Sequence, residues 1–404
     1  MAVTTWSYDN TTNQNLKYLQ FKFKKEFHDW TSGNHDIDQL IQQTQLNVMK
    51  AQDIIEWIPF NKFANLKYLA KGGFGTVFKA LWIDGYIIGL NGMKNEWKRR
   101  SQMDVCLKSL DNSKNVKRAF IEEIENQHKH GGNSAMKIYG ITKNPKDGNY
   151  MIVMEYAKKG SHRKLLDSKY NELDWASKIA NLYYIADGLN TIHEAKLVHK
   201  DFHSGNIVNQ NTFSPYITDF GLCKPVSQDP NSRELFGVLP YIAPEVLYTS
   251  GKEYTQKSDI YSFGIIMSEV FTGYPPYHDI PHDKDLATRI CLGYRPKISC
   301  KTPQILLDLM NKCLDAEPQN RPTAKELTNK LNHFYKDLKN EETKLCKQIK
   351  DIKGSSKEPS MVISTRFTYQ TDEQAIYTSR LLHFLELPKP ENYRTFQGQS
   401  PLSK

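Results

Sequence analysis

The stretch that decides the fold is Leu197–Gly221, which reads LVHKDFHSGNIVNQNTFSPYITDFG. It gathers two carboxylates and one amide, Asp201, Asn206 and Asp219, within a short span. Short apolar runs flank these groups and look like two strands that present them at their ends. A carboxylate and an amide oxygen that converge from two strand ends form a hard-oxygen site that suits Mg2+. A second carboxylate nearby can orient an attacking hydroxyl group and accept its proton.

The two motifs in this stretch carry a resemblance to a known family. His199-Lys200-Asp201 followed by Asn206 resembles the catalytic loop H-R-D-x-x-x-x-N of protein kinases, and Asp219-Phe220-Gly221 resembles their D-F-G motif. Either motif alone is a weak signal, since short matches occur by chance. Their order and close spacing favour the resemblance over the alternative, a strand pair with solvated acids in its turns.

The composition agrees with an intracellular enzyme of this kind. With 404 residues, of which 39% are hydrophobic, the chain is long enough for a two-lobed domain with a sizeable core. The net charge of +9 is modest and spread along the chain, which does not indicate nucleic acid as a partner. No stretch has the length of a membrane span, no signal-peptide pattern is seen, and the six cysteines form no C-x-x-C pair. We therefore expect a cytoplasmic location.

A glycine-rich turn follows the first expected strand, Phe63 to Ala70. It resembles the kinase loop that covers the phosphates of ATP, whose glycines let backbone amides approach phosphate oxygens closely. Ala70 stands where that pattern has its first glycine. The nucleotide-binding positions that the resemblance implies here are Ala70, Gly72, Gly73, Gly75 and Val77.

A lysine strand comes next, because Val105-Cys106-Leu107-Lys108 resembles the kinase V-A-I-K motif. Lys108 would hold the α- and β-phosphates of ATP. A lysine in a partly buried cleft needs a carboxylate partner to stay charged, and Glu123, on a helix expected over 116–129, aligns best. Glu122 is one position off and would point elsewhere on the helix. Gln127 stands where kinases usually place an apolar residue.

The run from Tyr150 to Met154 is continuously apolar and predicts a strand buried on both faces. By resemblance it ends the N-lobe, and the hinge follows. The residues that this implies around adenine are Met154 as gatekeeper, the backbone groups of Glu155 and Ala157, and the side chains of Val77, Cys106 and Val208.

The second half of the chain continues the resemblance. A helical apolar stripe runs over 175–193, and Ala243-Pro244-Glu245 resembles the A-P-E motif. Asp259 looks like the buried aspartate that holds the catalytic-loop backbone, and Arg321 looks like the partner of Glu245. Both are buried charges that should be paired.

The two ends lie outside the resemblance. An apolar stripe from Leu16 to Trp30 predicts a helix, and Asp36 or Asp38 could cap a second one. This part could pack on the kinase lobe, act as a docking or autoinhibitory segment, or be disordered. Residues 339–362 read as a charged linker, and residues 375–384 could form a short helix that packs on the surface or serves as a linear motif. The basic run 94–100 reads as a solvated loop, with a docking patch as the alternative.

Together these observations predict an α+β fold of two lobes. We expect a helical extension over 1–57, a kinase domain over 58–338 (N-lobe about 58–155, C-lobe about 156–338) and a linker and tail over 339–404. The expected ligands and partners are ATP, Mg2+ and protein substrates, with regulatory or adaptor proteins at the two ends. The roles implied by the resemblance are Mg2+ binding by Asn206 and Asp219, phosphate orientation by Lys108 with Glu123, and positioning of the acceptor hydroxyl by Asp201.

The motifs predict less directly which hydroxyl group accepts the phosphate. His203, in the segment H-S-G-N, resembles tyrosine-kinase-like serine/threonine kinases, whereas Val238 matches neither the serine/threonine nor the tyrosine pattern. We favour serine and threonine, with dual or tyrosine specificity as the alternative. Lys200 replaces an arginine that could grip a phosphate with two bonds, so we expect weak dependence on phosphorylation of the activation loop, with Ser227 and Ser232 as candidate sites. The rival from another class is a pseudokinase scaffold, which Ala70, Gln127 and Lys200 mildly favour.

Overall fold

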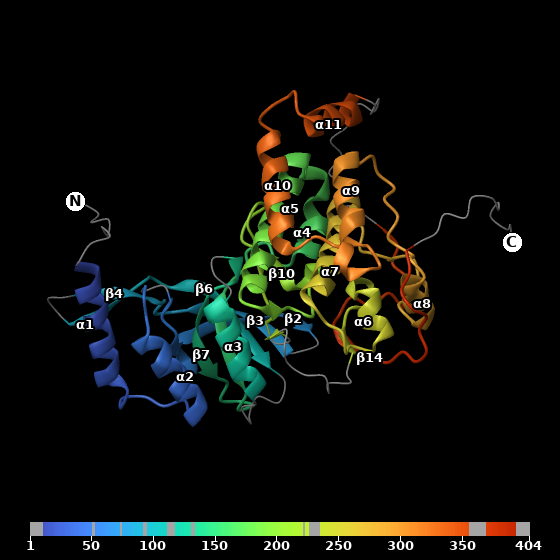
Figure 1. The fold of residues 1–404 in the computed structure, drawn as a ribbon. Helices are drawn as coiled ribbons and strands as arrows, with labels where there is room; N and C mark the ends of the chain where they lie inside the picture. Colours follow the sequence, from blue (N-terminus) through green and yellow to red (C-terminus); the bar gives the residue numbers. More distant parts are fainter. Residues whose placement is uncertain are drawn as a thin grey trace, which may run out of the picture. The chain divides into compact units, whose positions relative to one another are not determined.

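The computed structural model describes residues 11–50, 53–72, 75–91, 95–110, 118–130, 134–220, 223–225, 235–354 and 369–392 (Figure 1). The chain divides into two compact units. Unit 1 comprises Met1–His130 and Met136–Tyr156, and unit 2 comprises Gly131–Ala135 and Ala157–Lys404. Each unit is described by itself. Within the described parts, no helix combines the length and the apolar character needed to cross a lipid bilayer.

Unit 1 is built on one mainly antiparallel sheet with helices beside it. Its elements are α1 (Thr11–Glu26), α2 (His35–Leu46), β1 (Glu56–Trp57), η2 (Phe60–Lys62), β2 (Phe63–Gly72), β3 (Gly75–Trp82), β4 (Ile87–Asn91), β5 (Glu96–Arg99), β6 (Met103–Leu110), α3 (Arg118–His130), β7 (Ile138–Lys143) and β8 (Tyr150–Glu155). The strand order is β1-β7-β8-β6-β3-β2, with only β1 and β7 parallel among these paired strands. The strands predicted around 63–70, 105–108 and 150–154 are confirmed.

The hydrophobic pattern explains the inner position of β8. All residues from Tyr150 to Met154 are buried, as a strand covered on both faces requires. One cluster beside this strand joins Ile152 to Ile37 and Ile41 of α2 and to Ile124 of α3. The second helix of the N-terminal part therefore packs into the core of unit 1. Of the three alternatives for this part, this agrees with packing on the lobe.

Two details of this N-terminal part differ from the prediction. The cap of α2 is Asn34, whose Oδ1 accepts hydrogen bonds from the backbone N–H groups of Asp36 (3.0 Å) and Ile37 (3.1 Å). An aspartate cap was the wrong expectation, because the helix already begins at His35. The first helix ends at Glu26, so Phe27 and Trp30 contribute apolar contacts from outside it.

The basic run expected in a solvated loop is partly in a β-hairpin. β4 and β5 pair antiparallel, and Arg99 in β5 forms an ion pair with the buried Glu56. Arg99 also donates a 2.8 Å hydrogen bond to the carbonyl oxygen of Gly85. Burial raises the pKa of Glu56 against the opposing effect of Arg99. The solvated-loop prediction is therefore wrong at Arg99, and Lys94 lies outside the described residues.

Unit 2 is mainly helical. Its elements are α4 (His162–Lys169), η4 (Tyr170–Glu172), α5 (Trp175–Glu194), β9 (Leu197–Val198), η5 (Ser204–Asn206), β10 (Ile207–Asn209), β11 (Pro215–Ile217), β12 (Lys224–Pro225), β13 (Leu235–Gly237), η7 (Leu239–Tyr241), α6 (Pro244–Tyr248), α7 (Gln256–Thr272), α8 (Lys284–Cys291), α9 (Gln304–Cys313), η8 (Pro318–Asn320), α10 (Ala324–Asp337), α11 (Lys344–Gly354) and β14 (Arg380–Leu382). The helix predicted over 175–193 is confirmed as α5, and α10 packs along it (Figure 1).

Helix α7 is the centre of this unit, because every residue from Ser258 to Thr272 is buried. Thr255 and Ser258 form a reciprocal capping box at its start. It ends at Gly273, whose φ of 79° lies in the left-handed region. A Cβ atom at Gly273 would come within 2.8 Å of the Tyr170 ring. The position therefore needs glycine, both for its backbone conformation and for the space that a side chain would require.

Two predictions about the C-terminal part are wrong. The stretch predicted as a charged linker contains α11, in which Leu345, Cys346 and Ile349 are buried, and Leu345 and Ile349 belong to the main apolar cluster of unit 2. The segment predicted as a helix over 375–384 is extended and includes β14, which pairs antiparallel with β13. Its backbone hydrogen bonds are therefore made with a partner far away in the sequence.

Candidate active site

The backbone of the loop between β9 and η5 is held by hydrogen bonds to Asp259 of α7. Its carboxylate accepts hydrogen bonds from the backbone N–H groups of His199 (2.8 Å) and Lys200 (3.1 Å). It also lies 2.9 Å from Nε2 of His193 at the end of α5. Lys200 has a φ of 68°, a strained conformation for a residue with a side chain. The predicted role of Asp259 as the anchor of this loop is confirmed by these contacts.

Asp201 is the acid that this loop presents. Its side chain is buried, and Asn206 Nδ2 donates hydrogen bonds of 3.0 Å to both the carbonyl oxygen and Oδ2 of Asp201. Burial raises the pKa of Asp201, but the nearby His203 and hydrogen bonds from His203 and Ser379 outweigh burial and leave the pKa below its usual value. Asp201 is therefore a carboxylate at neutral pH, able to accept a hydrogen bond or a proton.

His203 lies beside this carboxylate, with its Nε2 3.5 Å from Asp201 Oδ2. Burial lowers the pKa of His203, but the charge of Asp201 prevails and raises it. The backbone N–H of Gly205 donates to His203 Nδ1 at 3.1 Å, which leaves the proton of the neutral ring on Nε2. The side chain of His203 thus presents a donor to the same place as the carboxylate of Asp201.

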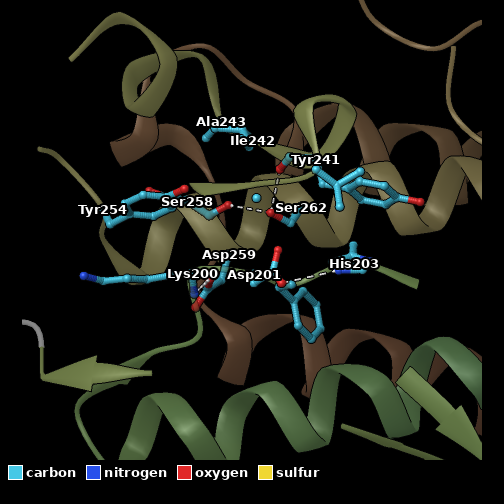
Figure 2. Close-up of a pocket in the computed structure, with 13 residues that line it drawn as sticks. Lys200, Asp201, His203, Tyr241, Ile242, Ala243, Tyr254, Ser258, Asp259 and Ser262 are labelled. Atoms are coloured by element: carbon cyan, nitrogen blue, oxygen red, sulfur yellow. Dashed lines mark hydrogen bonds and ion pairs between the residues drawn. The ribbon is translucent and has the colours of Figure 1, made fainter. Parts of the chain in front are cut away.

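A small cavity of about 10 Å3 lies next to these residues, with room for about a single water molecule. Figure 2 shows Lys200, Asp201 and His203 along one side of it and Tyr241, Ile242 and Ala243 along the other. The side chains on the two sides of this cavity therefore leave little free space beside Asp201.

A buried network that sequence reasoning did not find supports the neighbouring Ser204. Glu269 of α7 accepts hydrogen bonds from Ser204 Oγ (3.0 Å), Tyr241 Oη (2.7 Å) and Arg163 Nη1 (2.9 Å). Burial raises the pKa of Glu269, and the charge of Arg163 opposes this effect. No local sequence motif predicts this network, because its four residues come from distant parts of the chain.

The residues predicted to bind metal flank two paired strands, β10 and β11. β10 follows Asn206 directly, and β11 ends two residues before Asp219. The Thr218 N–H donates to the Asn206 carbonyl oxygen at 2.9 Å, which joins the two positions. Because Nδ2 of Asn206 is used by Asp201, its amide oxygen is the atom suited to a cation. An amide oxygen and a carboxylate are ligands that Mg2+ accepts, together with phosphate oxygens and water. The donor set therefore fits Mg2+.

The predicted lysine–glutamate pair is present in unit 1. Lys108 Nζ lies 2.6 Å from Glu123 Oε1, and both side chains are buried. Glu122, one position away, instead pairs with Arg118 at the surface. Gln127 donates hydrogen bonds to the Met136 carbonyl oxygen (2.7 Å) and to Met154 Sδ (3.7 Å). A polar residue at this position of α3 is thus accommodated by partners on the neighbouring segment.

The structure distributes the predicted nucleotide-binding residues over both units. Ala70 and Gly72 lie in β2, Gly75 and Val77 in β3, Cys106 and Lys108 in β6, Met154 and Glu155 in β8, Ala157 directly after unit 1, and Val208 in β10. Gly73 lies outside the described residues, as do Ser227 and Ser232. Burial raises the pKa of Cys106 to about 12, so its thiol is a neutral, apolar surface.

One further residue at the site was not predicted. Ser379 Oγ, in the described C-terminal segment 369–392, donates a 2.6 Å hydrogen bond to Asp201 Oδ2 and lies 3.3 Å from His203 Nε2. The sequence predicts that residues 375–384 could form a short helix, and it assigns Ser379 no role. A seryl hydroxyl directly on the candidate base is the arrangement that an acceptor would have.

Comparisons with known proteins agree with this geometry. A family model described as "Protein tyrosine and serine/threonine kinase" matches residues 63–331. Tyrosine-protein kinase SPK-1 of Girardia tigrina is 29% identical over 287 residues, which are 67% of this chain and 53% of that protein. Receptor-interacting serine/threonine-protein kinase 1 of Homo sapiens is 27% identical over 304 residues, 71% of this chain and 44% of that protein. Receptor-interacting serine/threonine-protein kinase 4 of Mus musculus is 29% identical over 279 residues, which are 66% of this chain and 33% of that protein.

The chain thus spans about half or less of the length of these relatives. The matched region includes Lys108, Glu123, Asp201, Asn206 and Asp219 in the order that the motifs predict. With two thirds of the chain inside the matched region, this protein belongs to the protein tyrosine and serine/threonine kinase family.

Proposed function

We propose that this chain is a protein kinase that transfers the γ-phosphoryl group of ATP to serine and threonine hydroxyl groups of proteins. The observation that carries the proposal is the 2.6 Å hydrogen bond from Ser379 Oγ to Asp201 Oδ2. A short side chain brings its hydroxyl to this carboxylate while its neighbours pair with β13. A tyrosine at position 379 would carry its hydroxyl several ångströms further from the backbone.

The roles of the other residues follow from their chemistry. Lys108, kept charged by Glu123, would orient phosphate oxygens. Asn206 and Asp219 would hold Mg2+, which supplies neutralisation of charge on the phosphates. Asp201 would orient the acceptor hydroxyl and take up its proton. Most of the rate enhancement would come from positioning and from preorganised charge.

The adenine of ATP would be bound by backbone groups of Glu155 and Ala157, with Met154 as gatekeeper. Val77, Cys106 and Val208 would cover its faces. The glycine-rich turn from Ala70 to Gly75 would cover the phosphates.

The location and the partners are also proposals. All six cysteines fall among the described residues and none forms a disulfide, which suits the reducing cytoplasm. Regulatory or adaptor proteins would bind through the two ends of the chain. Phe21 and Met49 in the N-terminal part are 54% and 71% exposed, and they are candidates for such contacts.

The test is phosphoryl transfer from labelled ATP and Mg2+ to a peptide library, followed by phosphoamino-acid analysis. We expect label on serine and threonine, lost in Asp201→Asn and in Lys108→Met. Label mainly on tyrosine would support the specificity in the name of the Girardia relative. Equal background label in all three proteins would indicate a pseudokinase scaffold.

A further inference from the structure

The described C-terminal segment, residues 369–392, lies along unit 2 in an extended conformation (red in Figure 1). Its strand β14 pairs with β13 in the register Leu235 with Leu382, Phe236 with Leu381 and Gly237 with Arg380. The backbone edge of β13 is therefore occupied by this chain's own segment β14. Pairing of this kind is how an extended peptide adds to a sheet edge.

Contacts on the N-terminal side of Ser379 fix where the segment lies. The N–H of His282 donates to the Gln374 carbonyl oxygen at 3.0 Å, and His282 Nδ1 lies 3.0 Å from the Ile376 carbonyl oxygen. Tyr377 stacks edge-on against the His282 ring, with centroids 4.9 Å apart, and donates a 2.9 Å hydrogen bond to the Pro276 carbonyl oxygen. These contacts hold both the backbone and a side chain of the segment.

Contacts on the C-terminal side complete the placement. Arg380 Nη2 donates a 2.8 Å hydrogen bond to the His282 carbonyl oxygen. Leu382 is 7% exposed and joins the main apolar cluster of unit 2, whereas its neighbour Leu381 is 58% exposed. Alternate burial along β14 therefore fixes its register, so that a shift by one residue would bury the wrong side chain.

The acceptor position lies between these two sets of contacts. Ser379 is 9% exposed and its hydroxyl contacts both Asp201 and His203. Gly237, opposite Arg380 in the ladder, has a φ of 145°, a conformation that suits glycine, and its Cα lies close to Asp201, since a Cβ there would be at contact distance (3.5 Å) from Asp201 Oδ1. Thr378, the neighbouring hydroxyl, is exposed to solvent.

We propose that residues 369–392 are an intramolecular substrate of this chain and that Ser379 is its phosphoacceptor. The inference rests on the proposed kinase activity and names a substrate of the same site. In the step, Ser379 Oγ bonds to the γ-phosphorus of ATP and the bond from that phosphorus to the β,γ-bridging oxygen breaks. ADP leaves with the bridging oxygen, and the hydroxyl proton passes to Asp201 Oδ2.

The product should not stay where it forms. Phosphoserine carries close to two negative charges at neutral pH, and beside the Asp201 carboxylate these charges repel. The hydrogen bond from Ser379 is lost at the same time. Phosphorylation would therefore release β14 from β13 and open the edge to other protein substrates. Before that step, the segment competes with every external substrate for the same place.

The experiment uses the full chain, treated with phosphatase and then given ATP and Mg2+. We expect mass spectrometry to find phosphate on Ser379 at a rate per molecule that does not change when the protein is diluted, as an intramolecular reaction requires. Ser379→Ala should remove this phosphate, and Thr378→Ala should keep it. Phosphorylation that slows on dilution would overturn the intramolecular route.

A matched pair of variants tests the competition. Leu382→Asp places a charge in the buried position of β14, and Leu381→Asp places the same charge on its exposed side. We expect Leu382→Asp to slow phosphorylation of Ser379 and to lower the KM for an external peptide about fivefold or more, because the site is no longer self-occupied. Leu381→Asp should change neither. If Leu382→Asp melts early, Ser379→Asp provides the same release by repulsion from Asp201.

The outcomes separate this inference from the proposed function. An active enzyme that phosphorylates an external peptide, lacks phosphate on Ser379 and has the same KM in both leucine variants would overturn the inference alone. A protein that transfers no phosphate to Ser379, to its variants or to any peptide would overturn both.

Discussion

The guanidinium group of Arg321 donates hydrogen bonds of 2.7 Å to each carboxylate oxygen of Glu245. Arg321 is 1% exposed and Glu245 is 8% exposed, so the pair is almost free of water. The arginine also donates from Nε to the Asp315 carbonyl oxygen at 2.7 Å. This fork joins the start of α6 to the loop before α10.

We expect Glu245→Ala to destabilise unit 2 by about 3–5 kcal/mol, because Arg321 would keep its charge in a buried place without its partner. Chemical denaturation followed by tryptophan fluorescence measures the change. The matched control is Glu122→Ala, which breaks the exposed pair with Arg118 and should change stability little. Similar stability in both variants would contradict the assignment of Arg321 and Glu245 as a structural pair.

Asp259→Asn should loosen the catalytic loop. One of its two oxygens becomes an NH2 group, which cannot accept the N–H of His199 or Lys200. We expect kcat to fall about 100-fold, since small misplacement of a reacting group has large effects, with the KM for ATP nearly unchanged. The control is Asp308→Asn, at an exposed position of α9. An Asp259→Asn enzyme with wild-type kcat would show that the loop is held by other contacts.

Glu123→Gln tests the pairing in unit 1. The substitution keeps the shape and one acceptor but removes the charge that stabilises the buried ammonium group of Lys108. We expect kcat/KM for ATP to fall about 10- to 100-fold, and Glu122→Gln on the next position of α3 to leave it near wild type. Equal losses in both variants would indicate a general effect on α3 instead of the specific ion pair.

Stability should depend on pH through His162. Burial, together with the positive charge of Arg163, lowers the pKa of this histidine to about 4 from 6.5. Between these two values the unfolded chain binds the extra proton and the folded chain does not, so the free energy of unfolding should fall as the pH drops through 6.5 and level off below 4. The loss from this one group should reach roughly 3 kcal/mol.

The variant His162→Leu should remove that part of the pH dependence, measured by denaturant titrations between pH 4 and 7. Burial also lowers the pKa of His128, His199 and His282, so a smaller slope should stay. The exposed His333→Leu is the control and should leave the slope unchanged. A His162→Leu slope equal to that of the original chain would contradict the prediction.

Short sequence motifs predicted more of the site than the spacing of hydrophobic residues did. Lys108 and Glu123 meet, Asp259 holds the loop, and Arg321 pairs with Glu245, because each motif residue has a fixed local geometry in its strand, helix or turn. Segments whose conformation depends on a distant partner were mispredicted. Arg99 is ordered by Glu56, which lies 43 positions earlier, and β14 is extended because β13 offers a backbone edge.

One of the mispredicted segments carries a signal in its own sequence. In α11 the buried residues Leu345, Cys346 and Ile349 have helical spacing, but the charged residues around them favoured a linker. The role of Ser379 had no local signal, since a serine between a threonine and an arginine is ordinary in sequence. Only the pairing of β14 with β13 brings its hydroxyl to Asp201.

The three-residue ladder between β13 and β14 also limits what an incoming protein must look like. Any partner that replaces β14 has to offer free backbone N–H and C=O groups for the residues that follow its acceptor. A serine inside a helix has those groups already engaged and would have to unwind first. The enzyme would therefore select for loops, tails and other extended segments by their backbone conformation, whatever their side chains.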